Sequence, residues 1–286
     1  MRTVAQPGPA APERIQAVEA GGRPVRAVLE PGVPLLDAVR AAFAAQGCAG
    51  GVLRLTGGAL GPLAYVMPAL SETPDHAAYY SPAHRPQGPS RIAAGALTLG
   101  WRDGAPSFHC HAFWTEADGA PGGGHVLPES TIIAEPIPVE GLGLVGAAFV
   151  AAPDPETNFA LFGPVPRAGA RDASDRRVFA VRLRPNQDLA GALEAFCRAR
   201  GIAAAEIHGG VGSIIGARYR DGRRVDAFAT EMAIVSGRIG PDAAGASRAD
   251  VDVRLVDYTG AVSGGGLVRG DNPTLITVEL VLEPRG

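Results

Sequence analysis

The hydrophobic and polar positions of this chain follow the same succession of patterns twice. An alternating apolar stretch at 24–32 precedes a segment whose apolar residues recur at helical spacing and which stops at Gly47. A second stretch at 178–186 precedes a segment of the same kind that stops at Gly201. Apolar residues three and four positions apart form one face of a helix, and glycine commonly follows its end. Each half is therefore predicted to open with a strand and then a helix.

Individual residues of the two halves also correspond. Pro31 matches Pro185, and the correspondence continues at the same spacing through both helical segments. Further along, Gly95 is paired with Gly237, and the glycine-rich stretch 118–124 is paired with 259–265. Self-similarity over this distance indicates a repeated supersecondary unit. The sequence therefore predicts two tandem copies of one small α/β unit.

Composition suggests where the copies begin and end. The first domain is expected to cover 13–165 and the second 177–286, because 166–176 is rich in proline, glycine and charged residues that are typical of a linker. Residues 1–12 are rich in alanine and proline and contain no apolar run, so a disordered tail is predicted there. Phe159, just before the linker, is expected to pack against a folded part.

The first copy is longer because of an insertion that falls within 68–91. This stretch contains His76, Tyr79, Tyr80, His84 and Arg85 among prolines and serines, which is typical of an ordered loop. We hypothesise that Tyr80, His84 and Arg85 close over a site and bind a substrate. The alternative is a surface or interface loop.

Composition and charge exclude several classes of function. The formal net charge is −3, and all 26 basic residues are arginines scattered along the chain, so no broad positive surface for nucleic acid or anionic lipid is indicated. The absence of lysine excludes Schiff-base enzymes, pyridoxal-phosphate enzymes and Walker-type phosphate loops. Three widely spaced cysteines do not form a disulfide framework, so we expect a cytoplasmic protein. The first residues resemble neither a signal peptide nor a membrane span.

Three histidines form the most informative motif. His109 and His111 lie in an alternating segment that is predicted to be a strand, so their side chains share one face and Cys110 points to the other. The Asp118-Gly119 pair favours a hairpin turn, which would bring His125 opposite His111 or its neighbour. We call His109, His111 and His125 the histidine cluster.

Three imidazoles suit zinc or another borderline divalent ion, and only three protein ligands leave a position for water or substrate. The alternative is that these histidines only form hydrogen bonds. At the matching positions the second copy has Asp250, Asp252 and Gly266, so the cluster is absent there. We therefore interpret the second copy as structural.

The stretches Phe108–His111, Asp118–Gly119 and Gly123–His125 resemble the plant and prokaryote conserved domain, or PPC domain. The resemblance covers the chain twice, although the second copy departs from the family pattern at every histidine. It implies an α/β (α+β) fold with a mostly antiparallel sheet packed with helix, and association as trimers. In plants such domains accompany AT-hook motifs and act on chromatin. An AT-hook core is Arg-Gly-Arg-Pro, of which Gly22–Pro24 is only a fragment, so we interpret that fragment as structural.

Together these features favour a metal-dependent enzyme or sensor for a small polar or anionic molecule, with a zinc-like ion at the histidine cluster. Glu116 or Asp118 is considered as a base, and the catalytic residues are otherwise unassigned. Two alternatives remain at this point. One is a DNA-associated transcriptional regulator, and the other is a structural oligomer with a vestigial metal site.

Overall fold

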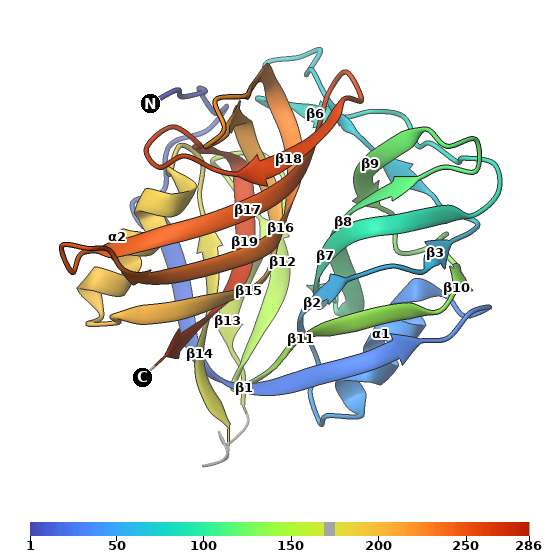
Figure 1. Ribbon diagram of the computed structural model, residues 1–286, viewed down its shortest axis with the longest axis horizontal. Helices are drawn as coiled ribbons and strands as arrows, with labels where there is room; N and C mark the ends of the chain where they lie inside the picture. The colour runs from blue at the N-terminus through green and yellow to red at the C-terminus, as the bar shows by residue number, and fades with distance from the viewer. Residues whose placement is uncertain (169–174, 286) are drawn as a thin grey trace.

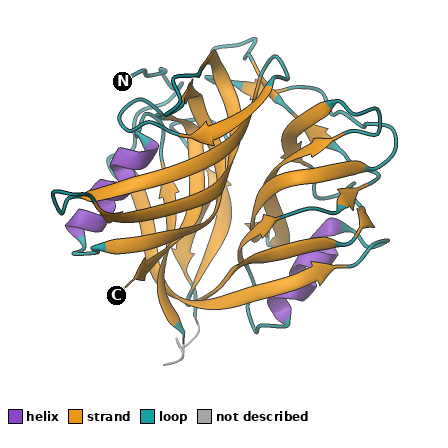
Figure 2. Ribbon diagram, viewed as in Figure 1, coloured by secondary structure: helices purple, strands orange, loops and turns teal. Residues whose placement is uncertain are grey.

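The computed structural model describes residues 1–168 and 175–285, and strands dominate this part of the chain (Figure 2). The first repeat comprises β1 (Ile15–Leu29), α1 (Leu35–Ala44), β2 (Gly51–Leu55), β7 (Ser90–Arg102), β8 (Ala105–Thr115), β9 (Pro121–Val126) and β11 (Ile137–Val145). The second comprises β14 (Arg176–Leu183), α2 (Leu189–Ala199), β15 (Ala204–Arg218), β16 (Arg224–Pro241), β17 (Ser247–Asp257), β18 (Val262–Gly266) and β19 (Thr274–Arg285). The remaining short strands are β3 (Ala59–Leu60), β4 (Tyr65–Val66), β5 (Pro68–Ala69), β6 (Tyr79–Tyr80), β10 (Ile133–Glu135), β12 (Ala147–Pro153) and β13 (Ala160–Pro166).

The two repeats have the same strand order. In the first, neighbouring strands pair in the order β9, β8, β7, β2, β11 and β1. In the second, the order is β18, β17, β16, β15, β19 and β14. All of these pairs are antiparallel, and one helix follows the first strand of each repeat. The predicted mostly antiparallel, helix-packed fold and its tandem duplication are therefore confirmed.

Strand registers show which residues correspond between the repeats. His111 pairs with His125 across β8 and β9, and Asp252 pairs with Gly266 across β17 and β18, so the histidine positions were matched correctly. In contrast, Gly237 pairs with Val251 on the next strand. That places Gly237 at the position of Leu97 and not at that of Gly95. Both β7 and β16 carry a bulge, which hides the two-residue shift from a comparison of sequences.

Strand β1 joins the two sheets into one. Its first half pairs with β14 of the second repeat, and its second half pairs with β11 of the first repeat. Gly21 and Gly22 pair on both sides, and a Cβ at Gly22 would lie 2.6 Å from Val178, so only glycine fits this crossing. The Gly22–Pro24 fragment is therefore part of the sheet, as its structural interpretation required. Figure 1 shows β1 running along the base of the molecule from one repeat to the other.

Each repeat buries a helix on one face of its sheet and meets the other repeat with the opposite face. The helix α1 packs Leu35, Val39 and Phe43 into the first core, and α2 does the same in the second. Between the sheets, Phe113 of β8 packs with Val256 of β17. The same buried cluster includes Ala96, Val211 and Ala233. In Figure 1 the helices lie on the outer sides and the sheets face one another.

The N-terminal segment differs from the predicted disordered tail. The Arg2 side chain hydrogen bonds to Asp271, and the Val4 backbone makes two hydrogen bonds with the side chain of Asn186. These contacts tie the first residues to the second repeat, because their backbone donors and acceptors find partners there. Most of the predicted linker 166–176 lies outside the described residues.

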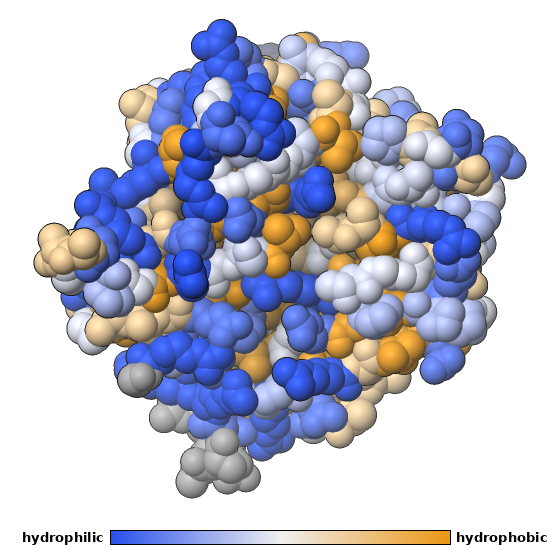
Figure 3. Space-filling view, viewed as in Figure 1, coloured by the Kyte–Doolittle hydropathy of each residue, from blue (hydrophilic) through white to orange (hydrophobic). Residues whose placement is uncertain are grey.

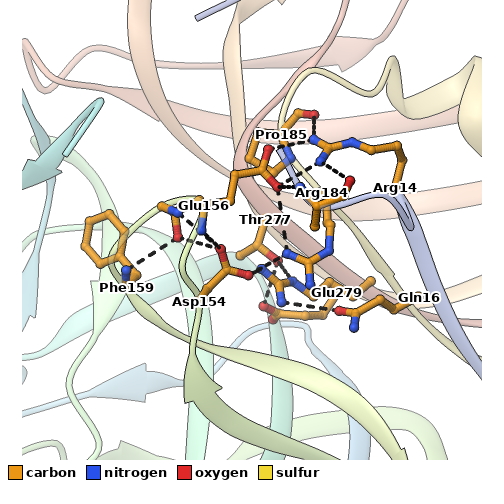
Figure 4. A network of polar contacts seen from close by, with 12 residues as sticks. Arg14, Gln16, Asp154, Glu156, Phe159, Arg184, Pro185, Thr277 and Glu279 are labelled. Atoms are coloured by element: carbon orange, nitrogen blue, oxygen red, sulfur yellow. Dashed lines mark hydrogen bonds and ion pairs between the residues drawn. The ribbon is translucent and has the colours of Figure 1, made fainter. Parts of the chain in front are cut away.

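A buried polar network holds the β12–β13 hairpin against the second repeat (Figure 4). The Asp154 carboxylate accepts hydrogen bonds from Arg182 at 2.7 Å and Arg184 at 2.6 Å, and Glu156 forms an ion pair with Arg14 at 2.8 Å. Burial opposes ionisation of Asp154, but the two arginines outweigh it and lower the pKa of the carboxyl group below its usual 3.8. The hairpin is therefore held in place by charge as well as by apolar packing.

On the face shown in Figure 3, hydrophilic residues dominate and hydrophobic ones form small separate groups. Within the described residues, neither helix is long and apolar enough to cross a membrane.

We predict that Asp154→Asn lowers the free energy of unfolding by about 3 kcal/mol, because it leaves Arg182 buried beside a neutral side chain. The carboxylate stabilises the fold at pH values above its unfolded pKa, and this contribution is lost as the pH falls below 3.8 through the lower folded value. Urea unfolding at pH 7 and pH 2 measures both effects. The exposed Asp37→Asn variant, which breaks only a surface pair with Arg40, is the control and should change stability by less than ~0.5 kcal/mol.

Candidate metal centre

The histidine cluster lies on one hairpin of the first repeat, on the face turned toward the second repeat. His109 and His111 are two residues apart on β8, and His125 is directly opposite His111 on β9. Cys110, between the first two, is fully buried in the core beneath α1. The predicted separation of histidines and cysteine onto opposite faces is confirmed.

The three imidazoles converge on one point. One ring nitrogen from each histidine lies within 4.8 Å of the others, and Nε2 of His109 is 3.1 Å from Nε2 of His111. Two nitrogen ligands on a tetrahedral zinc ion, each bonded at ~2.0–2.1 Å, would be roughly 3.3 Å apart. The spacing of the two Nε2 atoms is therefore close to that of ligands sharing one ion.

Groups of the second repeat hold two of the rings in place. Nδ1 of His109 donates to the Glu279 carboxylate at 2.6 Å, and Nδ1 of His111 donates to the Met232 carbonyl oxygen at 2.9 Å. A carbonyl or a carboxylate oxygen accepts a hydrogen bond, so the proton of each neutral ring is on Nδ1 and the lone pair is on Nε2. When both rings are neutral, the two lone pairs at 3.1 Å repel one another, and a cation between them removes the repulsion. Such outer partners are typical of histidines that bind metal.

Burial keeps the His111 and His125 rings in the neutral form that metals require. His111 is 2% exposed, and burial, together with neighbouring His109, holds its pKa well below 6.5. The pKa of His125 is lowered for the same reasons, with His111 adding to the effect. Nδ1 of His125 is buried and has no hydrogen-bond partner. Neutral imidazoles and a polar atom without a partner together fit a divalent ion.

Glu231 of β16 lies beside His111 of the cluster. Its Oε1 lies 3.8 Å from Nε2 of His111, and its Oε2 is buried without a hydrogen-bond partner. Burial raises the pKa of this carboxyl group well above its usual value, partly offset by the backbone N–H of His125. A second buried carboxylate therefore faces the histidine cluster, in addition to Glu279.

A cavity of about 50 Å³ opens beside the cluster, between the two repeats. Its polar wall includes Ser213, Thr230 and Glu231, and its aromatic wall includes Tyr80 and Phe159. By the ~10–15 Å³ that each water needs, it has room for a few waters or a very small molecule.

The insertion and the β12–β13 hairpin cover this cavity together. The Tyr80 ring lies 5.4 Å from the His125 ring and 5.8 Å from Phe159. Although 38% of Tyr80 is exposed, its hydroxyl end is buried, and this burial, together with the Glu231 charge, raises the pKa of the phenol. His76 of the insertion packs against Phe159 as well, with ring centroids 4.6 Å apart.

The other residues singled out from the sequence lie elsewhere. His84 stacks on Tyr65 at 5.1 Å, and Arg85 is exposed; neither lines the cavity. Glu116 approaches the Trp114 indole, and Asp118 accepts a hydrogen bond from Ala120 within the hairpin turn. Of the proposed substrate contacts, the structure places only Tyr80 at the site.

The interpretation of the second repeat as structural missed Glu231 and Glu279. The strand registers place Glu231 at the position of Arg91 and Glu279 at that of Pro138 in the first repeat. A carboxylate that occurs in only one of two related copies is a sequence signal for a functional residue. This signal was hidden because the bulges shift the alignment of the two copies and because nothing local indicates that the two sheets face each other.

Comparison with known families accounts for the second repeat. Residues 170–284 match the sequence profile of the Plants and Prokaryotes Conserved domain, written there as PCC. The second repeat is a PPC domain. The first repeat shares its strand order, so the chain contains the matched unit twice. No curated protein sequence matches the chain.

Several solved structures are similar to part of this chain. A PPC protein from Pyrococcus horikoshii is 17% identical with a TM-score of 0.41, and the match covers 52% of this chain and 97% of that one. A metal-containing protein from Archaeoglobus fulgidus is 19% identical with a TM-score of 0.38, covering 50% and 94%. A candidate DNA-binding protein from Ralstonia eutropha JMP134 is 16% identical with a TM-score of 0.37, covering 48% and 89%.

We predict that in metal-free protein at pH 7 the His111 ring carries its proton on Nδ1, because the Met232 carbonyl can only accept. Long-range ¹H–¹⁵N correlation NMR distinguishes the two tautomers, with His111→Ala providing the assignment. An Nε2–H tautomer for His111 would contradict the hydrogen bonding described above.

Proposed function

We propose that this PPC chain is a metal-dependent protein that binds and acts on a small polar molecule in the cavity beside the histidine cluster. The observation that carries the proposal is the convergence of the cluster, with the Nε2 atoms of His109 and His111 3.1 Å apart and both Nδ1 atoms engaged by the second repeat. With both rings neutral, hydrogen bonding leaves two lone pairs facing one another, and a cation between them removes this repulsion.

Zinc is the ion that we propose for the cluster. Imidazole nitrogen is a borderline donor that suits zinc and related divalent metals, whereas magnesium and calcium prefer oxygen ligands. The neutral state of buried His111 and His125 removes competition from protons near pH 7. When bound, such an ion supplies Lewis acidity for a ligand oxygen.

The residues around the cavity suggest how a ligand is held. Ser213 and Thr230 offer hydroxyl groups from one side, and Tyr80 and Phe159 form an apolar cover on the other. The cover limits access of bulk water, which strengthens electrostatic interactions inside the site. A ligand with one polar end and a small apolar body fits these walls.

The charge of the site favours a neutral polar ligand over an anion. Glu231 is 5% exposed and Glu279 is 0% exposed. Each carboxyl group faces a histidine of the cluster. Two carboxylates balance the charge of one divalent ion, so little positive charge remains to attract an anion. The sequence favoured a small polar or anionic ligand, and of these two classes we now propose a polar, uncharged one.

We predict about one zinc ion per chain in protein purified without chelators, and its loss in His109→Ala and His125→Ala, because each variant leaves two of the three imidazoles. Elemental mass spectrometry of the purified proteins measures the ratio. His84→Ala is the matched control, since its ring stacks on Tyr65 away from the cluster, and it should retain the metal.

If wild-type protein remains free of metal after incubation with zinc, cobalt or nickel, the proposed function is wrong. If metal is bound and His109→Ala retains it fully, the ion lies elsewhere in the chain. Once metal content is established, binding of small aldehydes, amides and alcohols is compared with that of carboxylic acids of equal size by calorimetry.

A further inference from the structure

Glu231 is a buried acidic side chain whose charge the surrounding protein leaves unbalanced. It is 5% exposed, it lines the cavity, and its Oε2 is buried without a hydrogen-bond partner. The backbone N–H of His125 is a donor to this carboxyl group, but burying an ionised carboxylate without a cation and with one oxygen unpartnered is strongly unfavourable. A group in this state points to a positive charge that the polypeptide itself does not provide.

The neighbouring His111 side chain does not provide that charge. Oε1 of Glu231 lies 3.8 Å from Nε2 of His111, but the proton of His111 is on Nδ1, where it bonds to the Met232 carbonyl. Nε2 therefore presents a lone pair toward the carboxylate. By contrast, Glu279 accepts hydrogen bonds from His109 and from the Thr277 hydroxyl, so its charge is compensated.

We propose that Glu231 is a fourth protein ligand of the ion at the histidine cluster, so that both repeats contribute ligands to one site. This inference rests on the proposed function. Oε1 of Glu231 lies 3.8 Å from Nε2 of His111, which is somewhat longer than the roughly 3.3 Å expected between two ligands of a tetrahedral zinc ion. A carboxylate oxygen is an ordinary zinc ligand, and zinc can expand to five ligands, so three histidines and one carboxylate still leave a position for a ligand oxygen.

The differences between the repeats support this division. The second repeat has Asp250, Asp252 and Gly266 where the first has its histidines, and the first repeat has Arg91 where the second has Glu231. Neither repeat alone therefore carries the four ligands. The proposal gives the second repeat a role in binding in addition to its role in folding.

Replacing Glu231 tests the proposal in the full chain loaded with cobalt(II) or zinc. Glu231→Gln is expected to weaken zinc binding by about 100-fold in competition with a coloured chelator, and Glu231→Ala by at least as much. The visible absorption of the cobalt-loaded protein should change in shape and intensity, because it reports the number and type of ligands.

Glu279→Gln is the matched control, because Glu279 touches His109 through Nδ1 and not through the atom that faces the ion. It should weaken binding by about 10- to 100-fold while leaving the cobalt spectrum unchanged, as expected for an outer partner. Circular dichroism and thermal unfolding of the metal-free variants check that each is folded.

The outcomes separate this inference from the proposed function. If wild-type protein binds one ion through the histidines and Glu231→Gln has the same affinity and cobalt spectrum, the fourth ligand is refuted and the three-histidine site stands. If the wild type binds no metal, both fail. If the variants do not fold, a crystal structure of the zinc-loaded wild type decides: a Glu231 oxygen about 2.0–2.2 Å from zinc supports the proposal, and one beyond about 3 Å overturns it.

Discussion

The antiparallel pairing of β1 with β14 is the interaction on which the arrangement of this molecule depends. Because β1 also pairs with β11, one strand belongs to both sheets, and the second repeat cannot move independently of the first. The crossing falls at Gly21 and Gly22, where the backbone is paired on both edges and Val178 leaves no space for a side chain at Gly22. Joined in this way, the sheets fold against each other and bury the faces turned away from their helices.

That burial gives the histidine cluster its properties. On an isolated hairpin, His111 and His125 would be solvated and would titrate near 6.5. In the folded chain, β16 and β19 cover the cluster, the Met232 carbonyl and the Glu279 carboxylate fix two tautomers, and burial keeps His111 and His125 neutral. The same contact removes Glu231 from water. Duplication has therefore produced two different halves, one that carries imidazoles and one that carries carboxylates.

The segments outside the repeated unit complete the site. The insertion contributes Tyr80, and the β12–β13 hairpin contributes Phe159, whose rings close the cavity from one side. Asp154, near the tip of the same hairpin, is held by Arg182 and Arg184 of the second repeat. Figure 4 shows that this network extends to Thr277 and Glu279, so the cover and the groups behind His109 share a framework.

The sequence by itself determined the repeated unit, the helices that end before Gly47 and Gly201, and the hairpin that pairs His111 with His125. These features depend on local periodicity and turn chemistry, which act between residues close in the chain. Only the tertiary structure decided that the two sheets face each other, that Tyr80 but not His84 or Arg85 reaches the cavity, and that Glu231 and Glu279 stand behind the cluster. These facts depend on contacts between residues that are dozens to more than a hundred positions apart, and a pattern along the chain contains no information about which surfaces meet.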